Sequence, residues 1–160
     1  GLTWQLFNNA GVPGWKNTNG DVELQKVSTG SGLTQGFEID VAGAVDEIYQ
    51  GVKTEAGKTY SVHFDVVKFK AGTSDFQVLW NGTVVTTISP TAEQGYDLSV
   101  IGTGGVDKLS FKELASQNNG TGAVIDNVSL IEPAVHGHGS TFVSPSPTTF
   151  MIQQTASIAT

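Results

Sequence analysis

The stretch Phe76–Ser89, which reads FQVLWNGTVVTTIS, decides the fold class of this chain. Every second residue over Phe76–Trp80 is apolar, which is the pattern of a strand with one buried face. Asn81-Gly82 follows directly, and a two-residue type I′ turn favours Asn-Gly because both of its central residues need a positive φ. The sequence therefore predicts an antiparallel hairpin whose return strand covers Thr83–Ser89.

Period-two alternation recurs along most of the chain and predicts further strands. In Thr59–Phe69 every second residue from Tyr60 is apolar, until the phase slips at Val66–Val67. One extra residue in one strand of a pair shifts the phase in this way, so the slip predicts a β-bulge. Turn residues separate the other predicted strands, which cover residues 21–27, 36–41, 47–54, 96–101, 108–113 and 123–131.

Strand number and composition together indicate the fold class. About nine short strands without helical periodicity are typical of an all-β sandwich or barrel. The chain has 160 residues, which suits one domain, and its 20 Gly suit tight turns. We therefore expect an all-β antiparallel sandwich or barrel over residues 1–132. A Gly/Ser/Pro-rich linker is expected over 133–149, followed by a β-prone tail segment over 150–160 that can act as a strand.

Charge and cysteine content exclude several classes of function. The formal net charge is −7, and all eight basic residues are Lys. Nucleic-acid surfaces are basic and favour Arg, which binds phosphate with two parallel hydrogen bonds, so we expect no nucleic-acid partner. The chain has no Cys, which excludes disulfides and thiol chemistry. No apolar stretch reaches membrane-spanning length, so membrane insertion is not expected either.

Several short motifs occur in a fixed order along residues 4–131. They are Val12-Pro13-Gly14-Trp15 with Gly20–Leu24, Ile48-Tyr49-Gln50 with Ala56–Tyr60, the Asn81-Gly82 hairpin with Gly102–Gly105, and Ile125–Leu130. This order resembles bacterial extracellular domains with the galactose-binding-like jelly-roll sandwich, related to xylan- and glucan-binding carbohydrate-binding modules. The resemblance implies that residues 1–132 form a jelly-roll-like antiparallel β-sandwich. It also implies a non-catalytic module, extracellular or at the cell surface, whose partner is a neutral polysaccharide or surface glycan.

The resemblance has one departure, at the start of the sequence. Members of such families open with a strand like Asn-Gly-x-Phe-Glu before the Pro-Gly-Trp turn, and residues 1–7 lack that pattern. We therefore expect the opening strand to be missing, which leaves a sheet edge unpaired. The tail segment is the candidate to fill the gap, by folding back or by inserting into a second copy, through Phe150, Ile152, Gln154, Ala156 and Ile158. Exchange between copies implies a homo-oligomer or a filament, as in a surface layer, appendage or matrix fibre, and the alternative is an ordinary disordered tail.

Asp126 is the leading candidate for a metal ligand. It shares its strand phase with Val128 and Leu130, and a carboxylate on an apolar face is costly unless it is paired or bound to a cation. In the families that the chain resembles, this Asp helps to hold a structural calcium ion together with a Glu of the opening strand. Glu23 and Glu132 are the candidate substitutes for that Glu, because calcium accepts a range of oxygen ligands. The alternative is that Asp126 accepts a hydrogen bond from a turn backbone.

Aromatic side chains are the candidates for sugar contact, because the apolar face of a pyranose ring stacks on Trp or Tyr. Trp15 follows a Pro-Gly turn and Trp80 ends a strand at a hairpin, so we expect these two side chains to be exposed. Tyr49 and Tyr96 are further ligand-binding candidates. Trp4 also qualifies, and for each of these residues the alternative is a place in the core.

Paired acidic side chains are the sequence feature that would indicate glycosidase chemistry, because glycosidases use a pair of carboxyl groups. The sequence offers Glu38 with Asp40, and Asp46 with Glu47. We expect these side chains on exposed faces, without the burial that tunes a catalytic pKa. No Ser-His-Asp order, phosphate-binding glycine loop or His-Glu metal motif is present in the sequence. The sequence therefore predicts no catalytic residues, and an enzyme is the least favoured class.

Overall fold

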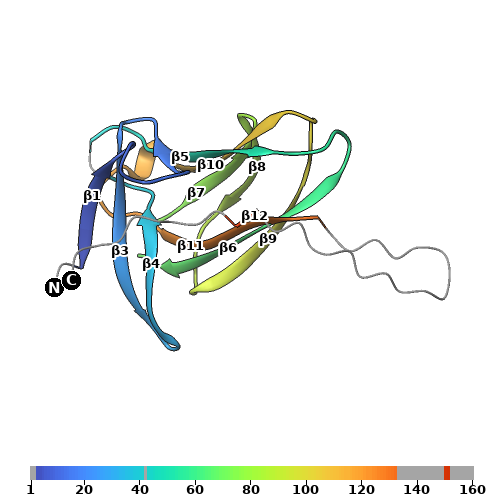
Figure 1. Cartoon of the computed structure of the whole chain (residues 1–160). Coiled ribbons are helices and arrows are strands. Elements are labelled where there is room, and N and C mark those ends of the chain that lie inside the picture. Colours follow the sequence, from blue (N-terminus) through green and yellow to red (C-terminus); the bar gives the residue numbers. More distant parts are fainter. Residues whose placement is uncertain (1–2, 42, 133–149, 152–160) are drawn as a thin grey trace.

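The computed structural model of the chain describes residues 3–41, 43–132 and 150–151. These residues form two antiparallel sheets, seen as two layers in Figure 1. Helical structure in this part of the chain is limited to the 3-10 turn η1 (Ala115–Gln117). No helix in the described ranges is long and apolar enough to cross a membrane. The all-β sandwich predicted from the sequence is confirmed.

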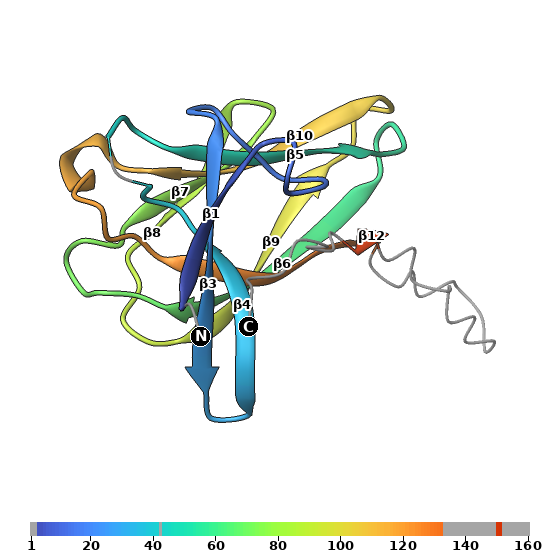
Figure 2. The same cartoon turned by 60° about the vertical axis from the view of Figure 1, so that its left-hand side comes forward.

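The larger sheet combines strands from both halves of the chain. Its β3–β4 hairpin extends beyond the rest of the sandwich, at the bottom of Figures 1 and 2. Neighbouring strands are antiparallel, and successive side chains alternate between the core and the outer face of the sheet. In spatial order the strands are β1 (Trp4–Asn8), β3 (Asp21–Thr29), β4 (Gly32–Glu38), β11 (Val124–Ile131), β6 (Thr59–Lys68) and β9 (Gln94–Ile101).

The smaller sheet contains the hairpin predicted from its Asn-Gly turn. Asn81 and Gly82 have φ values of 51° and 80°, as a type I′ turn requires. The register of this hairpin shifts once, between Val78 and Leu79. In spatial order the strands are β2 (Lys16–Asn17), β5 (Glu47–Lys53), β10 (Val106–Glu113), β7 (Phe76–Trp80) and β8 (Thr83–Ile88).

The core between the sheets is built around aromatic rings from both layers. Trp15 packs against Phe37 and Phe111, with ring centroids 4.8 and 6.0 Å apart. Phe64 of β6 meets Phe111 of β10 edge-on, at 5.1 Å. Burying a large apolar side chain contributes about 1.5–3 kcal/mol, and edge-on ring pairs add to this. These contacts hold the two sheets against each other.

A β-bulge changes the side-chain phase of β6. Val124 pairs with Lys68 and Ile125 pairs with Val66, so Val67 is an extra residue in this strand. The bulge predicted at Val66–Val67 is therefore confirmed. Val66 belongs to the main core, whereas Val67 packs in a small separate apolar cluster that also includes Val124.

An opening strand is present, contrary to the expectation from the sequence. β1 pairs with β3 along its whole length and forms one edge of the larger sheet. Its alternate side chains Trp4 and Leu6 are 53% and 45% exposed, so the strand lacks the polar and apolar alternation that marks a half-buried strand. The strand predicted over 36–41 also begins earlier, at Gly32, because the exposed Leu33 conceals its start.

Two residues of the tail segment form a strand. β12 (Phe150–Met151) pairs with Ser129 and Leu130 of β11. β4 pairs with β11 only at Val124 and Ile125, so β12 pairs with a part of β11 that β4 does not reach. The prediction that the tail acts as a strand is confirmed for these two residues. The other predicted assembly residues, Ile152, Gln154, Ala156 and Ile158, and the linker over 133–149 lie outside the described residues.

Candidate functional site

An exposed tryptophan lies beside a groove on the outer face of the larger sheet. Trp4 lines this groove, of about 370 Å³, together with Glu23 and Gln25 of β3. The opposite side comes from the end of β4, the end of β6 and the loop before β11. Its polar residues include Glu38 and Lys68. We call this region the Trp4 groove.

Gln25 joins the polar side chains of the Trp4 groove. Its Nε2 donates to Oε1 of Glu23 at 2.8 Å and also to Oε2 of Glu38. Its Oε1 accepts a hydrogen bond from Nζ of Lys68 at 3.1 Å. The groove thus offers hydrogen-bond donors and acceptors beside the ring of Trp4. A sugar requires this combination, because it presents hydroxyl groups at its edge and an apolar ring face.

Glu38 is buried at the base of this groove, although the sequence led us to expect it on an exposed face. Burial raises the pKa of Glu38 to about 8, together with a hydrogen bond to Glu23 and the negative charges of Glu23 and Asp40. The backbone N–H of Gly122 donates to Oε1 at 2.7 Å and partly opposes this rise. Near neutral pH the Glu38 carboxyl group is therefore mainly protonated in the folded protein.

The two tryptophans that were expected at the surface are both buried. Trp15 is 1% exposed, because its ring fills the core between Phe37 and Phe111. Trp80 is 8% exposed, and its indole N–H donates to the carbonyl of Ile101 at 3.0 Å. A turn exposes the neighbouring side chain only where no other element packs over it. The expected exposure of Trp15 and Trp80 is wrong, and neither ring offers a free face to a sugar.

The two tyrosine candidates are partly buried and have other contacts. Tyr49 lies under the Lys108 ammonium group, which is 4.4 Å from the ring centroid. Tyr96 stacks on Phe64 with centroids 5.3 Å apart, and its hydroxyl accepts a hydrogen bond from Gln94. Neither tyrosine lines the Trp4 groove. Their role as sugar contacts stays a prediction.

Asp126 lies on the outer side of its strand and not on the apolar face where we expected it. The register of β11 shifts between Asp126 and Ser129, and Asn127 has a φ of 52°. This second bulge changes the phase, so Val128 is buried in the core while Asp126 is not. Asp126 accepts hydrogen bonds from the backbone N–H of Asn127, at 2.7 Å, and from the Thr34 hydroxyl.

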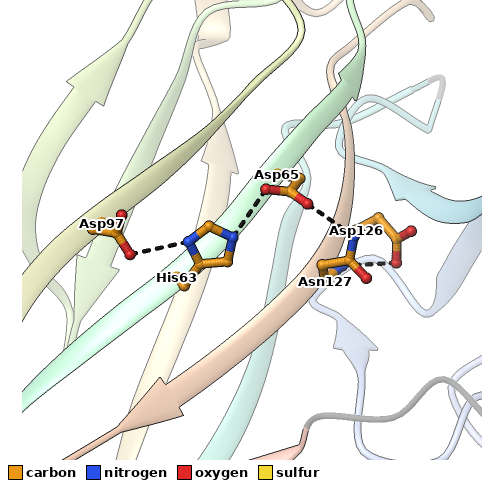
Figure 3. Close-up of polar contacts among 5 residues, drawn as sticks. All are labelled: His63, Asp65, Asp97, Asp126 and Asn127. Carbon is orange, nitrogen blue, oxygen red and sulfur yellow. Dashed lines mark hydrogen bonds and ion pairs between the residues drawn. The ribbon is translucent and has the colours of Figure 1, made fainter. Parts of the chain in front are cut away.

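Figure 3 shows that Asp126 adjoins a chain of hydrogen bonds on this face. His63 lies between two carboxylates, 3.0 Å from Asp97 and 2.9 Å from Asp65. The second oxygen of Asp65 accepts a hydrogen bond from the Asn127 side chain at 2.8 Å. These polar groups satisfy one another, so the expected apolar environment of Asp126 is absent.

The three residues predicted to share a calcium ion have separate partners. Glu132 pairs with Lys58 at 3.1 Å, and Glu23 accepts from Gln25 in the Trp4 groove. Neither is hydrogen-bonded to the groups that hold Asp126. Within the described ranges, a different set of acidic side chains comes close enough to share a metal ion. It consists of Asp40, Asp46 and Glu113.

This set, which we call the carboxylate cluster, lies at the end of the smaller sheet where β5 begins and β10 ends. One oxygen from each of Asp40, Asp46 and Glu113 lies within 4.8 Å of the others. The three residues are 2%, 0% and 4% exposed. The expectation that Asp40 and Asp46 lie on exposed faces is wrong.

Loop residues hold the carboxylate cluster inside the protein. Oδ1 of Asp46 accepts hydrogen bonds from the side-chain amides of Asn17, at 2.6 Å, and Asn19, at 2.8 Å. Oδ2 of Asp40 accepts three backbone N–H groups, from residues 119, 120 and 121, at 2.8, 2.8 and 3.1 Å. Sequence reasoning missed this cluster, because Asn17, at the end of β2, Asn19 and residues 119–121 are distant in sequence from the acids that they hold.

Two carboxyl groups of the cluster, those of Glu113 and Asp46, are harder to ionise than free ones. Burial raises the pKa of Glu113 to about 7, and the charges of Asp40 and Asp46 add to the effect. Burial also raises the pKa of Asp46, although hydrogen bonds from Asn17 and Asn19 counteract it. The two residues share these causes, because both lie away from water and beside the charge of Asp40.

Asp107, at the other end of β10, is a buried acid with the opposite behaviour. Oδ2 accepts hydrogen bonds from the Thr54 hydroxyl at 2.6 Å and from the Thr103 backbone N–H at 3.0 Å. Oδ1 accepts from the Asn81 side chain at 2.9 Å and from the Thr103 hydroxyl. Burial raises the pKa of Asp107, but these hydrogen bonds outweigh it and lower the value to about 2.

Solved structures of carbohydrate-binding modules resemble this fold. The family 35 module from Clostridium thermocellum is 11% identical with a TM-score of 0.50, and the match covers 81% of this chain and 98% of that one. The family 35 module from Paenibacillus barcinonensis is 19% identical with a TM-score of 0.48, over 79% and 97% of the two chains. A family 35 module from an environmental isolate is 20% identical with a TM-score of 0.48, over 84% and 94%. No family model and no curated protein matches the chain.

The Clostridium thermocellum match extends the fold description beyond the number of strands. The two antiparallel sheets of this chain have the arrangement of a carbohydrate-binding-module jelly roll. The fold class expected from the sequence motifs is therefore confirmed. Function has to be argued from the site, because one sandwich architecture hosts many activities.

Proposed function

We propose that this chain is a non-catalytic carbohydrate-binding module, and that it binds a neutral polysaccharide or surface glycan in the Trp4 groove. The observation that carries the proposal is the exposed ring of Trp4 beside a polar groove on the sheet face. A large aromatic side chain that is half exposed loses favourable burial, and a ligand that stacks on it restores that burial. The proposed location is a cell surface or an extracellular matrix.

The charge of the groove supports a neutral ligand. Glu23, Glu38, Lys68 and Lys70 all line the groove, so its formal charges balance, and protonation of Glu38 near neutral pH leaves a net charge of only +1. Gln25 supplies a neutral amide between them. No strong excess of either sign remains to select an anionic or a cationic polymer.

The same two acids support a binding role over hydrolysis. Glycosidases hold their two carboxyl groups about 5 Å apart or more, so that the sugar and a water molecule fit between them. Glu23 and Glu38 instead hydrogen-bond to each other and share Gln25 as a donor. Glu38 is also only 4% exposed, which leaves little of it for a sugar to reach.

The test removes the stacking surface. Trp4→Ala should lower the affinity for the bound polysaccharide by about tenfold or more, which corresponds to about 1.4 kcal/mol of lost stacking. Calorimetry or affinity electrophoresis against xylan, β-glucan and galactan would measure this. Leu6→Ala is the matched control, because Leu6 lies on the same strand, is also exposed and does not line the groove. Equal binding by Trp4→Ala and the unaltered chain would contradict the proposal.

A second candidate function is a structural subunit that assembles into a surface layer, appendage or filament by exchange of the tail strand. The pairing of β12 with Ser129 and Leu130 of β11 favours it, because the same backbone hydrogen bonds can form with the tail of a second copy. Met151→Pro should weaken the pairing by removing a backbone donor. Light scattering of the full chain, this variant and a chain ending at residue 139 would measure the mass. A monomeric full chain at all concentrations would exclude assembly.

A structural calcium ion is part of the proposed carbohydrate-binding module. The ligand set expected from the sequence, with Asp126 at its centre, has little support from the geometry, because Asp126 is satisfied by Thr34 and Asn127. The carboxylate cluster fits a cation better. Its buried acidic oxygens lie close together, and the pKa values of Asp46 and Glu113 are raised by burial.

A further inference from the structure

Two oxygens of the carboxylate cluster have no hydrogen-bond partner. Oδ2 of Asp40 accepts three backbone N–H groups, but its Oδ1 is buried and unpaired. Oε1 of Glu113 accepts the backbone N–H of Asp46 at 2.7 Å, but its Oε2 is buried and unpaired. Buried carboxylate oxygens are nearly always satisfied in folded proteins. A side-chain hydrogen bond with Asp40 helps to raise the pKa of Glu113, so a proton shared between the two carboxyl groups satisfies these oxygens while Glu113 is protonated. Once Glu113 is ionised, both oxygens need a cation in place of that proton.

The ligand atoms of the cluster suit a hard cation. All three donors are carboxylate oxygens, with no His or Cys among them. Calcium binds oxygen at about 2.3–2.6 Å, so two of its ligands lie at most about 5 Å apart. The limit of 4.8 Å within which the cluster oxygens lie meets this condition. Magnesium keeps several of its water ligands and demands octahedral geometry, so a buried site whose ligands are protein carboxylates suits it less well.

We propose that Asp40, Asp46 and Glu113 together bind one calcium ion, through the unpaired oxygens of Asp40 and Glu113 and a free lone pair of Asp46. The inference rests on the calcium part of the proposed function and replaces the ligand set centred on Asp126. The ion would connect the loop at 40–46 to the last residue of β10.

The surrounding groups already orient the three carboxylates. The backbone N–H of Val41 and the amides of Asn17 and Asn19 fix Asp46. The backbone of residues 119–121 fixes Asp40, and the close approach requires Gly122. A Cβ at this position would lie 2.7 Å from the backbone nitrogen of Asp40. Such hydrogen-bonded support is what keeps metal ligands in place before the ion arrives.

The test titrates calcium chloride alone into chain freed of metal by a chelator. Calorimetry should give one ion per chain. Thermal unfolding at a calcium concentration of about 100 times the Kd should rise by about 5 °C or more over the chelator-treated sample. Magnesium chloride should give a much smaller shift. Absence of binding heat, or an unchanged unfolding temperature, would overturn the proposal.

Glu113→Gln and Asp40→Asn should each abolish the binding heat and the thermal shift. Two variants are used so that poor folding of one does not decide the result. Asp126→Asn is the matched control, because it also removes one acidic charge and lies outside the cluster. It should keep the full calcium response. A response lost in Asp126→Asn and kept in Glu113→Gln would overturn the assignment. Since no sugar is present, this outcome is independent of whether Trp4→Ala affects polysaccharide binding.

Discussion

The two ends of β10 place a buried carboxylate in opposite environments. At Asp107, near the start of the strand, donors from three residues satisfy both oxygens and the pKa falls to about 2. At Glu113, the last residue, one oxygen has no partner and burial raises the pKa to about 7. The two residues are similarly inaccessible to solvent. Burial alone therefore does not set the ionisation of an acid; the donors around it and, at Glu113, the charges of Asp40 and Asp46 decide the direction of the pKa shift.

The comparison separates a structural acid from a candidate ligand. The partners of Asp107 come from the β7–β8 turn, from Thr54 after β5 and from Thr103. The Asp107 carboxylate therefore joins three neighbouring turns. The cluster at Glu113 joins loops as well, but it holds three acids with too few donors. β10 therefore carries two kinds of acidic site. Asp107 is fully hydrogen-bonded without a cation, whereas the carboxylate cluster at Glu113 requires one under the calcium proposal.

The largest effect is expected from Asp107→Asn. The amide is neutral and accepts only at its oxygen, so all four donors lose a charged acceptor and two of them face an NH2 group instead. A hydrogen bond to a charged group contributes about 1.5–3 kcal/mol, and we expect a loss of about 3 kcal/mol of unfolding free energy. Urea denaturation at pH 7 would measure it. A loss below about 0.5 kcal/mol would mean that this network does not stabilise the fold.

Replacing the acid at the other end of β10, Glu113, by its amide should change the free energy of unfolding in the opposite direction. In calcium-free buffer at pH 8, Glu113→Gln removes a buried and partly unpaired charge while keeping an acceptor for the Asp46 N–H. Each unit of raised pKa corresponds to about 1.4 kcal/mol, and we expect a gain of about 1–2 kcal/mol. Urea denaturation in parallel with Asp107→Asn would measure it. A clear loss of stability would remove the contrast between the two ends.

In calcium-free buffer, the free energy of unfolding should depend on pH through the acids at both ends of β10 and through Glu38. Burial raises the pKa of Glu113 from 4.5 to about 7 and that of Glu38 from 4.5 to about 8, so between these values the folded state binds more protons than the unfolded state. Stability should therefore fall as pH rises from about 4.5 to 8. Asp107 acts oppositely, and its contribution, complete above pH 3.8, is lost as pH falls toward 2. Denaturation curves from pH 2 to 9 would test this, and calcium should flatten the high-pH limb.

The smallest effect is expected from Asn81→Gly. Glycine keeps the positive φ of the turn but removes the hydrogen bonds to Asp107, at 2.9 Å, and from the Lys108 backbone N–H, at 2.8 Å. We expect a loss of about 1 kcal/mol, which leaves most of the stabilisation by Asp107 in place. Thermal unfolding would measure the change. A loss as large as that of Asp107→Asn would mean that the turn, and not the full set of donors, stabilises this end.

The sequence predicted those parts of the fold that depend on neighbouring residues. The β7–β8 hairpin follows from Asn81-Gly82, and the bulge at Val67 follows from the slip in phase. β1 was missed because its exposed side chains are apolar, and the phase of β11 was wrong because Asn127 introduces a bulge. An Asn with positive φ in mid-strand leaves only a weak signal, since most Asn residues lie in turns.

The candidate sites were harder to predict because their partners are distant in sequence. Asp46 is buried by amides from Asn17 and Asn19, and Asp40 by the backbone after residue 118. No local pattern reveals such pairings, so polar residues there resemble an ordinary exposed face. Trp15 failed as a surface candidate for the same reason, because the sheet that covers it is formed by remote strands.

β10 is hydrogen-bonded on both sides, to β5 and to β7, and lies at the centre of the smaller sheet. Its middle residues, Leu109 to Phe111, are buried, so their amide hydrogens can exchange with heavy water only when the sandwich opens as a whole. The edge strand β8 has β7 as its one neighbour in the sheet, so we expect its amides to exchange faster. The exchange rate in the middle of β10 therefore reports the global unfolding free energy of the domain.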